Sequence, residues 1–313
     1  MAIKSLYDVP APAKLNLFLH VVGRRPDGYH LLQSVFVLID WCDTLHFESR
    51  TDGVISRVDL GAPLPQDDLC LRAAKSLQQA SGTNLGAVIS IEKRVPSGAG
   101  MGGGSSDAAS TLLALNRLWG LGWSLPELLP LGLKLGADVP FFLHGKNAWV
   151  EGIGEQITPI DVPVQRFAVI KPSSSVMTQD IFTSPLLVRN TAPAIVAGFS
   201  AGAQGADGRF FGRNDLQPPA MSVCTEIGQA ADLLERAFGN SRMTGSGSAV
   251  FAWADAGSNA ICKPDGEPDS KSVKELNTGA WPPELAPGWV SRMCSSLPEH
   301  PLFGWARKLD KQD

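Results

Sequence analysis

Residues 96–110 read PSGAGMGGGSSDAAS, and this stretch decides which folds the chain can adopt. Residues 87–93 ahead of it read as a strand, and behind it the apolar residues from Ala108 to Leu118 recur at roughly helical spacing. A strand that passes through a glycine-rich loop into a helix presents backbone N–H groups and the positive end of the helix dipole to an anion. We therefore expect a phosphate-binding loop. The glycines that remove side-chain bulk from it are Gly98, Gly100, Gly102, Gly103 and Gly104.

This stretch differs from three known kinds of phosphate loop. A P-loop places Lys and then Ser or Thr after its glycines, and no Lys follows the glycines here. Gly98, Gly100 and Gly103 satisfy G-x-G-x-x-G. The dinucleotide fold, however, also needs a second strand ending in an acid about 20 residues further on. Residues 124–130 at that position read as the capped start of a helix. The Val-Ala-Ile-Lys strand of protein kinases is missing. Two interpretations remain: an anion-binding loop at a helix start, and a flexible Gly/Ser linker. The strand and helix patterns on either side of the stretch disfavour the linker.

The composition is that of a globular chain with a substantial core. Of the 313 residues, 44% are hydrophobic and 19% are charged, and the length favours two domains. The formal charge of −4 argues against the basic surface that binds nucleic acid. The sequence has no run of 18 apolar residues, so we expect no membrane span. The five cysteines have neither zinc-site spacing nor a disulfide framework, so we expect a reducing, cytoplasmic setting.

The patterns along the chain predict interleaved strands and helices. Strands are expected at residues 13–22, 31–39, 44–48, 87–93 and 167–170, and helices at 68–77, 126–135 and 227–238. Asp68 stands near the start of the first helix, where it complements the dipole, and Gly136 is placed to cap the end of the second. We expect one domain at residues 1–165 and another at 166–313, with a polar, exposed insertion at 256–288.

Lys14 and Asp138 are charged residues in apolar surroundings. Lys14 lies in PAKLNLF (12–18), where an inward lysine costs free energy unless it pairs with a charge; the alternative is an edge-strand lysine in solvent. Asp138 lies in GADVPFF (136–142), where a carboxylate either caps turn amides or is a buried functional group. Because a buried lysine and a buried aspartate offset each other's desolvation, the pair is more plausible than either residue alone.

Three further segments have both a structural and a functional interpretation. DGYH at 27–30 is a turn before a strand, and its Tyr29 and His30 can stack on a base or bond its edge, or Tyr29 can simply be half-buried. Phe182 on its own reads as a core residue. TGSGS at 244–248 is either a hairpin turn or a second loop that braces the phosphate site.

In this order, the segments resemble the superfamily named for galactokinase, homoserine kinase, mevalonate kinase and phosphomevalonate kinase. That superfamily has a lysine-bearing N-terminal strand, a Pro-x3-Gly-Leu/Met-Gly-Ser-Ser type of loop and a late glycine-rich turn, matched here by residues 12–18, 96–109 and 244–249. The strings PAKLNLFL, DGYH, GADVPFF and EGIGE (151–155) resemble the branch that phosphorylates 4-diphosphocytidyl-2-C-methyl-D-erythritol. The resemblance covers residues 8 to about 252, and nothing is transferred from it to residues 256–288.

The resemblance implies an α+β fold of two domains, an N-terminal one like ribosomal protein S5 and a C-terminal ferredoxin-like α/β domain, with the active site in the cleft between them. It implies that Asp138 is the catalytic acid–base group and Lys14 its charged partner. Tyr29 and Phe182 would stack on the cytosine, and His30 would bond its edge. Asn16 and Thr178 would also bind substrate. The residues implied to hold the ATP phosphates are Pro96, Ser97, Gly98, Ala99, Gly100, Met101, Gly102, Gly103, Gly104, Ser105, Ser106 and Asp107, with support from Thr244, Gly245, Ser246 and Gly247.

The implied activity is transfer of the ATP γ-phosphoryl group to the 2-hydroxyl of this cytidine derivative, in the non-mevalonate formation of isoprenoid precursors. Mg²⁺ would accompany ATP, and its ligands stay open, with Ser105, Ser106 and Asp107 as candidates by position. No nucleic acid, membrane or obligate protein partner is expected. One alternative is a kinase for another small alcohol, such as homoserine or mevalonate, which has no use for base-stacking residues. The other is a nucleotide-binding module without kinase activity, in which Lys14 and Asp138 would be incidental.

Overall fold

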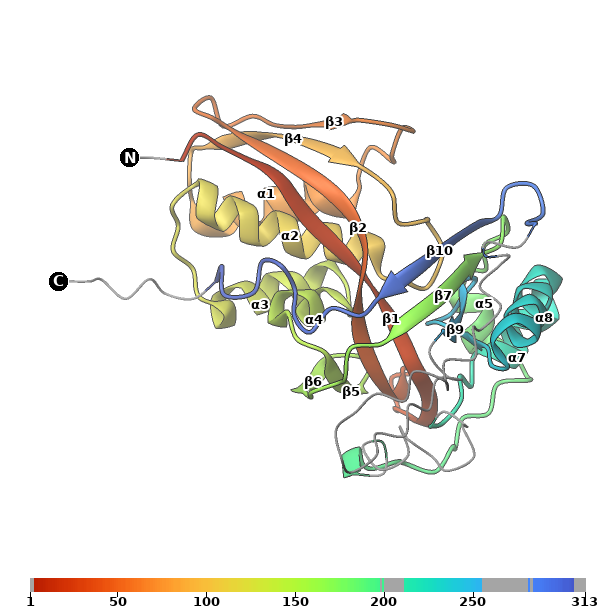
Figure 1. Cartoon of the computed structure of the whole chain (residues 1–313). Coiled ribbons are helices and arrows are strands. Elements are labelled where there is room, and N and C mark those ends of the chain that lie inside the picture. Colours follow the sequence, from red (N-terminus) through yellow and green to blue (C-terminus); the bar gives the residue numbers. More distant parts are fainter. Residues whose placement is uncertain (1–2, 198, 200–210, 255–280, 282–283, 307–313) are drawn as a thin grey trace, which may run out of the picture.

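The computed structural model describes residues 3–197, 199, 211–254, 281 and 284–306 (Figure 1). The strands are β1 (Ser5–Arg24), β2 (His30–Arg50), β3 (Ile55–Asp59), β4 (Gly86–Glu92), β5 (Ala148–Gly152), β6 (Gln156–Pro159), β7 (Arg166–Lys171), β8 (Arg242–Met243), β9 (Val250–Trp253) and β10 (Val290–Ser295). The helices are α1 (Leu69–Ser81), α2 (Gly103–Leu118), α3 (Leu125–Leu135), α4 (Val139–His144), α5 (Thr178–Thr183), α7 (Gln217–Val223) and α8 (Thr225–Phe238). Most of the insertion expected at 256–288 lies outside the described residues.

A long hairpin of β1 and β2 forms the spine of the molecule (Figure 1). Along one edge β2 pairs with β1, and along the other it pairs with β5 through Leu32–Phe36 and with β4 through Thr44–Arg50. The sequence predicted two separate strands at 31–39 and 44–48, but they are one strand. The polar residues between them include Asp43, whose fully buried carboxylate accepts backbone hydrogen bonds from the segment after β4, so a polar residue fits inside the strand.

The two faces of this hairpin pack on different cores. Successive side chains of a strand point to opposite faces. Phe36 and Leu38 therefore join the core beneath α2, whereas Val35 and Val37 pack with Phe167 of the second sheet. Because both faces are covered, the hairpin reads in the sequence as a nearly continuous apolar run.

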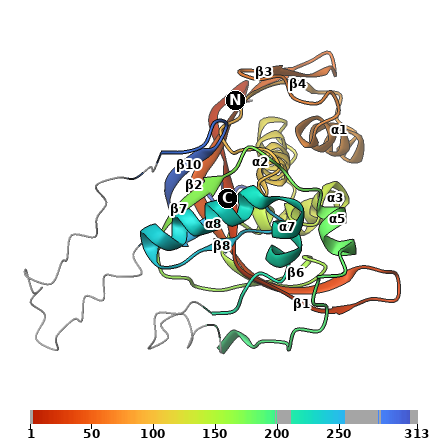
Figure 2. The same cartoon turned by 90° about the vertical axis from the view of Figure 1, so that its right-hand side faces the viewer.

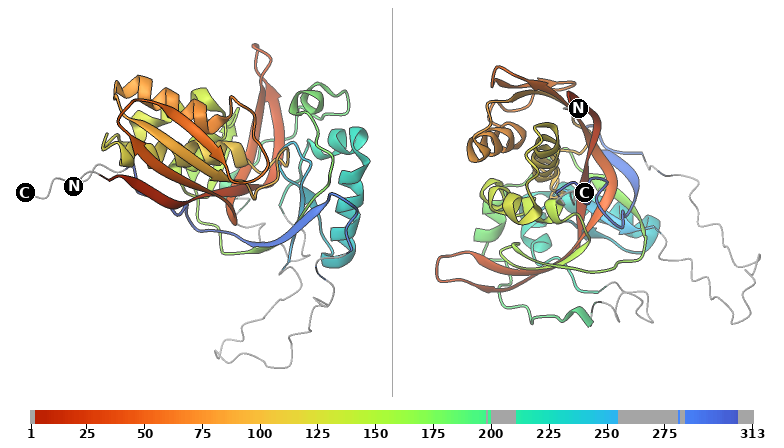
Figure 3. Two further views of the ribbon diagram at one scale, coloured as in Figure 1. Left: turned by 90° about the horizontal axis from the view of Figure 1, so that it is seen from above. Right: turned by 90° about the vertical axis from the view of Figure 1, so that its left-hand side faces the viewer.

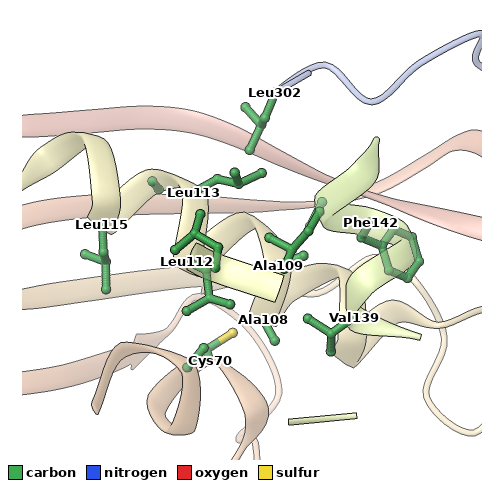
Figure 4. Packing of buried hydrophobic residues seen from close by; sticks show 14 of the residues in the cluster. Cys70, Ala108, Ala109, Leu112, Leu113, Leu115, Val139, Phe142 and Leu302 are labelled. Carbon is green, nitrogen blue, oxygen red and sulfur yellow. The ribbon is translucent and has the colours of Figure 1, made fainter. Parts of the chain in front are cut away.

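The first sheet has the strand order β3-β4-β2-β5-β6, with β1 on β2, and α1 to α4 cover one face of it. Helix α2 is the centre of this layer, packed between the sheet and its neighbouring helices. Figure 4 shows its Ala108, Ala109 and Leu112 among residues of α1 and α4, including Cys70 and Val139. The small alanines let the neighbouring helices approach closely, which explains why α2 is buried on nearly all sides.

The starts of two helices agree with their sequence signals, whereas the end of one differs from the expected cap. Helix α1 begins after Asp68, whose side chain accepts a hydrogen bond of 3.0 Å from the backbone N–H of Leu71. Helix α3 begins at a capping box of Ser124 and Glu127. It ends before Gly136 as expected, but Gly136 has φ 174°, which is extended backbone rather than a left-handed cap. No helix in the described part of the chain is long and apolar enough to cross a membrane.

The second sheet has the antiparallel order β10-β7-β9-β8, and α7 and α8 pack on it (Figure 2). After β10 the chain returns to the first layer, where the backbone N–H of Leu297 donates to the carbonyl of Leu38 at 2.8 Å. Leu302 and Ala306 then complete the first core. The domain boundary near residue 165 stays a prediction. The last segment belongs to the second half of the chain but packs on the first layer.

The closed end of the β1–β2 hairpin, residues 24–30, projects from the body of the molecule (Figures 2 and 3). Tyr29 at this end has 60% of its surface exposed. The hairpin thus connects a solvent-facing tip to the buried strand that contains Lys14.

Candidate active site

Two glycine-rich segments, far apart in the sequence, interlock at the centre of the molecule. We call residues 96–102 the glycine loop and residues 244–248 the glycine turn. Gly100 has φ 72° and Gly245 has φ 56°, in the left-handed region that favours glycine. A Cβ on Gly100 would lie 2.2 Å from the carbonyl oxygen of Thr244, and one on Gly245 would lie 2.7 Å from that of Gly100. Both backbones therefore need glycine to approach this closely.

Hydrogen bonds join the glycine turn to the loop and to the hairpin. The N–H of Ser248 donates to the carbonyl of Gly98 at 3.1 Å. The hydroxyl of Thr244 accepts a 2.9 Å hydrogen bond from the N–H of Asn16 in β1. The turn therefore connects the loop to the strand that carries Lys14.

Helix α2 starts directly behind the glycine loop. Gly102 occupies its N-cap position with φ 70°, and no side chain caps the helix. Free N–H groups at an uncapped helix start attract an anion. Ser105 and Ser106, expected in the loop, belong to the first turn of the helix. The hydroxyl of Ser106 is fully buried and has no hydrogen-bond partner among the described residues.

Two cavities border the glycine loop. The loop cavity, of about 410 Å³, is lined by residues 95–105 together with Leu69, Lys93 and Asp107. The hairpin cavity, of about 300 Å³, takes its wall from the hairpin, α5 and the glycine turn. Both cavities include Gly98, Gly100 and Gly102 in their walls. A group bound over the loop would therefore face both spaces.

Lys14 lies between the glycine loop and the hairpin cavity. Its backbone N–H donates to the carbonyl of Met101 at 2.9 Å, and its ammonium lies 3.5 Å from a carboxylate oxygen of Asp138. The ammonium also donates to Asn16 Oδ1 at 2.6 Å and sits 4.4 Å above the ring of Phe36. Burial lowers the pKa of Lys14 from its usual 10.5, and the charge of Asp138 opposes this shift.

Asp138 precedes α4 but does not cap it. No hydrogen bond joins its side chain to the first turn of that helix. The side chain is 31% exposed, and the residue belongs to the wall of the hairpin cavity. The structure shows no helix cap at Asp138, and the carboxylate is partly exposed rather than buried as the other interpretation expected. It is therefore available to a molecule in the cavity.

Asn16 fixes the geometry around Lys14. Its side-chain amide donates to the hydroxyl of Ser34 at 2.9 Å, while its Oδ1 accepts from Lys14. Asn16 is almost completely buried, yet it lines the hairpin cavity. It therefore orients the lysine at the boundary between core and cavity.

Lys93 is a cation of the loop cavity that the sequence analysis missed. Its ammonium forms ion pairs with Asp43 and Asp107, and the carboxylate of Asp43 also accepts the N–H of Val95 at 2.7 Å. Burial raises the pKa of Asp107 to about 8, although Lys93 opposes this. Its position three residues before the glycine loop is the local sequence signal for this lysine.

The residues expected to hold a base are divided between the hairpin cavity and its edge. Phe182 and Thr178 of α5 line the cavity, and the Thr178 hydroxyl lies 2.8 Å from that of Ser246. His30 stacks on Phe182, with ring centres 5.0 Å apart and ring planes 25° from parallel. Among the described residues, the cavity wall includes neither Tyr29 nor His30. That Tyr29 and Phe182 stack on the two faces of a bound cytosine remains a prediction.

Comparison with known proteins agrees with this geometry. The family model for the GHMP kinases N terminal domain matches residues 68–146, and the one for the GHMP kinases C terminal domain matches residues 197–265. The fold and the pair of interlocked glycine segments thus define a small-molecule kinase of this class, with ATP as the co-substrate of the class.

Individual relatives narrow the class. A 4-diphosphocytidyl-2-C-methyl-D-erythritol kinase of Methylibium petroleiphilum is 60% identical over 306 residues, 98% of this chain and 100% of the relative. The enzyme of that name from Polaromonas naphthalenivorans is 56% identical over 97% of each chain. A crystal structure of 4-(cytidine 5'-diphospho)-2C-methyl-D-erythritol kinase has 32% identity and a TM-score of 0.71, and the alignment covers 93% of this chain and 98% of that one. The chain belongs to the 4-diphosphocytidyl-2-C-methyl-D-erythritol kinase family.

Proposed function

We propose that this protein transfers the γ-phosphoryl group of ATP to the 2-hydroxyl of 4-diphosphocytidyl-2-C-methyl-D-erythritol, a step in the formation of isoprenoid precursors. The observation that carries the assignment of roles is the Lys14–Asp138 pair, 3.5 Å apart, beside a glycine loop that borders two cavities. The close relatives, which match nearly the whole chain, carry this activity in their name.

ATP fits the loop cavity. The backbone N–H groups of residues 98–102 and the start of α2 would hold its β- and γ-phosphates, since an uncapped helix start binds anions. The acceptor fits the hairpin cavity, with its hydroxyl near Asp138. The glycines shared by both walls support a position for the γ-phosphate between the two substrates. Phosphoryl transfer needs little more from a protein than in-line positioning and charge neutralisation.

The acceptor oxygen forms a bond to the γ-phosphorus while the bond from this phosphorus to the β,γ-bridging oxygen breaks, and its electron pair leaves with ADP. Asp138 accepts or orients the proton of the attacking hydroxyl. The ammonium of Lys14, which Asn16 holds in place, stabilises the negative charge that develops on the transferring group.

Mg²⁺ is proposed to enter with ATP, where it would neutralise phosphate charge. The described residues contain no cluster of three or more His, Cys, Asp or Glu side chains that could hold a metal by themselves. Two buried oxygens in the first turns of α2, Ser106 Oγ and Asp107 Oδ1, have no hydrogen-bond partner in the described part of the chain. This donor set fits a cation that takes most of its ligands from phosphate and water.

The proposal also places the enzyme in the cytoplasm, where it acts without an obligate protein partner. The four cysteines among the described residues are free thiols, as a reducing compartment favours.

An assay of ATP-dependent phosphorylation tests the function. The purified protein with ATP, Mg²⁺ and 4-diphosphocytidyl-2-C-methyl-D-erythritol should give ADP and a product whose new phosphate phosphorus NMR places on the 2-hydroxyl. CMP and CDP should compete with this acceptor. Turnover of homoserine or mevalonate instead, without competition by cytidine nucleotides, would assign another small-alcohol kinase. ATP binding without turnover of any alcohol would assign a binding module.

A further inference from the structure

Arg189 lies where the wall of the hairpin cavity meets the start of β2. Its guanidinium donates hydrogen bonds to three backbone carbonyls, those of Phe182 at 3.0 Å, Ser184 at 2.9 Å and Leu187 at 3.1 Å. It thus fixes the C-terminal end of α5 and the residues behind it. A fourth hydrogen bond, of 3.2 Å, runs from its Nε to Nε2 of His30.

The fourth hydrogen bond determines where the proton of His30 sits. A guanidinium has only N–H donors, so the Nε2 atom that faces it must offer a lone pair. The ring is then neutral, with its proton on Nδ1. The pKa of His30 lies below its usual 6.5, first because of burial and then because of the positive charges of Arg189 and Arg24. Geometry and charge therefore favour the same tautomer.

The same arginine also holds the partner of His30. The rings of His30 and Phe182 stack, and Phe182 is part of the cavity wall. Arg189 binds the ring of one residue and the backbone carbonyl of the other. A single side chain therefore sets the orientation of both.

We propose that Arg189 is a positioning residue for base recognition, which holds His30 as the neutral tautomer with a donating Nδ1–H. This inference rests on the proposed function, in which His30 bonds the edge of the cytosine. Cytosine offers acceptors at N3 and O2, whereas N3 of uracil carries a proton. A histidine fixed as a donor at Nδ1 therefore pairs with N3 of cytosine and not with that of uracil, and Arg189 contributes to this selection.

Nitrogen-15 NMR of the histidines tests the tautomer directly. In the wild-type protein, His30 should show a protonated Nδ1 and an unprotonated Nε2, with a His30→Gln variant for assignment. In Arg189→Met the Nε2–H tautomer should appear, and the pKa of His30 should rise toward 6.5. Arg189→Lys, which keeps a donor, should remain closer to the wild type. An unchanged His30 spectrum in Arg189→Met would overturn the proposal.

Steady-state kinetics test the consequence for substrate selection. Arg189→Met should raise the KM for the cytidine substrate about tenfold, the effect of losing one hydrogen bond, with the KM for ATP unchanged. The preference for CMP over UMP as competitor should fall in parallel. Arg50→Met, which breaks an exposed ion pair with Asp52, is the matched control. An equal rise in both KM values would reduce Arg189 to a structural role and refute the inference. Failure of the wild-type protein to phosphorylate the cytidine substrate would refute the proposed function, and the NMR result would still stand.

Discussion

Asp138 stands at the N-cap of α4 without capping it, and its carboxylate forms an ion pair with Lys14. Such a carboxylate is placed to act on a bound hydroxyl rather than to stabilise its own helix. Substitutions of single residues therefore test the proposed phosphoryl transfer directly.

Asp138→Asn should lower kcat by about 10²–10⁴, the usual contribution of a general base, because the amide cannot accept the proton of the hydroxyl. Binding of ATP, measured by calorimetry, should remain within a few fold of the wild type. Asp52→Asn, which changes an exposed carboxylate paired with Arg50, serves as the control and should retain full turnover. Near-normal turnover in Asp138→Asn would remove this residue from the mechanism.

Lys14 predicts the pH dependence of turnover on the alkaline side. Its pKa is lowered from 10.5, so the ammonium loses its proton at a pH below 10.5, and the charge proposed to stabilise transfer is present below that point and lost above it. A profile of kcat against pH should therefore fall as pH rises, before 10.5 is reached. Lys14→Gln should be much less active and should lack this alkaline limb. A wild-type rate that stays constant to pH 10.5 would contradict the role of the charge.

Individual residues were predictable from the sequence where one local pattern carried the signal. Lys14 and Asp138 stood out because they interrupt apolar runs. Whether Asp138 caps a helix depends on the backbone around it, and only the structure gives that backbone. Lys93 and Arg189 were missed for a related reason. Their partners, such as Asp43 and His30, are distant in the sequence, and no local spacing links them.

At the scale of elements, the contact between the glycine loop and the glycine turn leaves no room for a side chain on Gly100 or Gly245. Both segments were recognised as glycine-rich, but the sequence left open whether residues 244–248 form a plain hairpin turn or a brace. The structure shows that residues 244–248 form the turn between β8 and β9 and also hydrogen-bond to the glycine loop.

Gly100→Ala should weaken ATP binding and lower turnover, because the new Cβ would collide with the carbonyl of Thr244, 2.2 Å away, and force the two segments apart. Gly120→Ala is a matched control. Gly120 also has a positive φ, of 65°, but no atom lies within 4 Å of its added Cβ. The control should lose only about 1 kcal/mol of stability, from backbone strain, and keep its KM for ATP. Equal effects of the two substitutions on the KM for ATP would contradict the interlocking.

At the scale of the whole molecule, the chain is held together by the β1–β2 hairpin and by a returning C-terminal segment. The two-domain α+β fold followed from the resemblance of residues 8 to about 252, which includes most of the elements. The return of residues 296–306 to the first layer was not predicted. This segment is short and irregular, so it has no periodicity to read, and the contacts that hold it on the first layer are with distant parts of the chain.

Leu302→Ala should destabilise the protein by about 2–5 kcal/mol, since Leu302 is 3% exposed in the core of the first layer and its truncation leaves a cavity there. Chemical denaturation followed by circular dichroism measures this change. Leu186→Ala, at a leucine that is 56% exposed, should change the free energy of unfolding by less than about 0.5 kcal/mol. A similar, small effect of both substitutions would mean that the C-terminal segment does not stabilise the first layer.

The glycines that line both cavities also have a consequence for inhibitor design. A single molecule with an adenosine portion in the loop cavity and a cytidine portion in the hairpin cavity would need only a short chain of phosphates across Gly98, Gly100 and Gly102 to join them. Once one portion is bound, the other is held at a high effective concentration beside its own site, and the two affinities reinforce each other without any new contact. The shared wall would thus make the two proposed substrate sites addressable as one bivalent target.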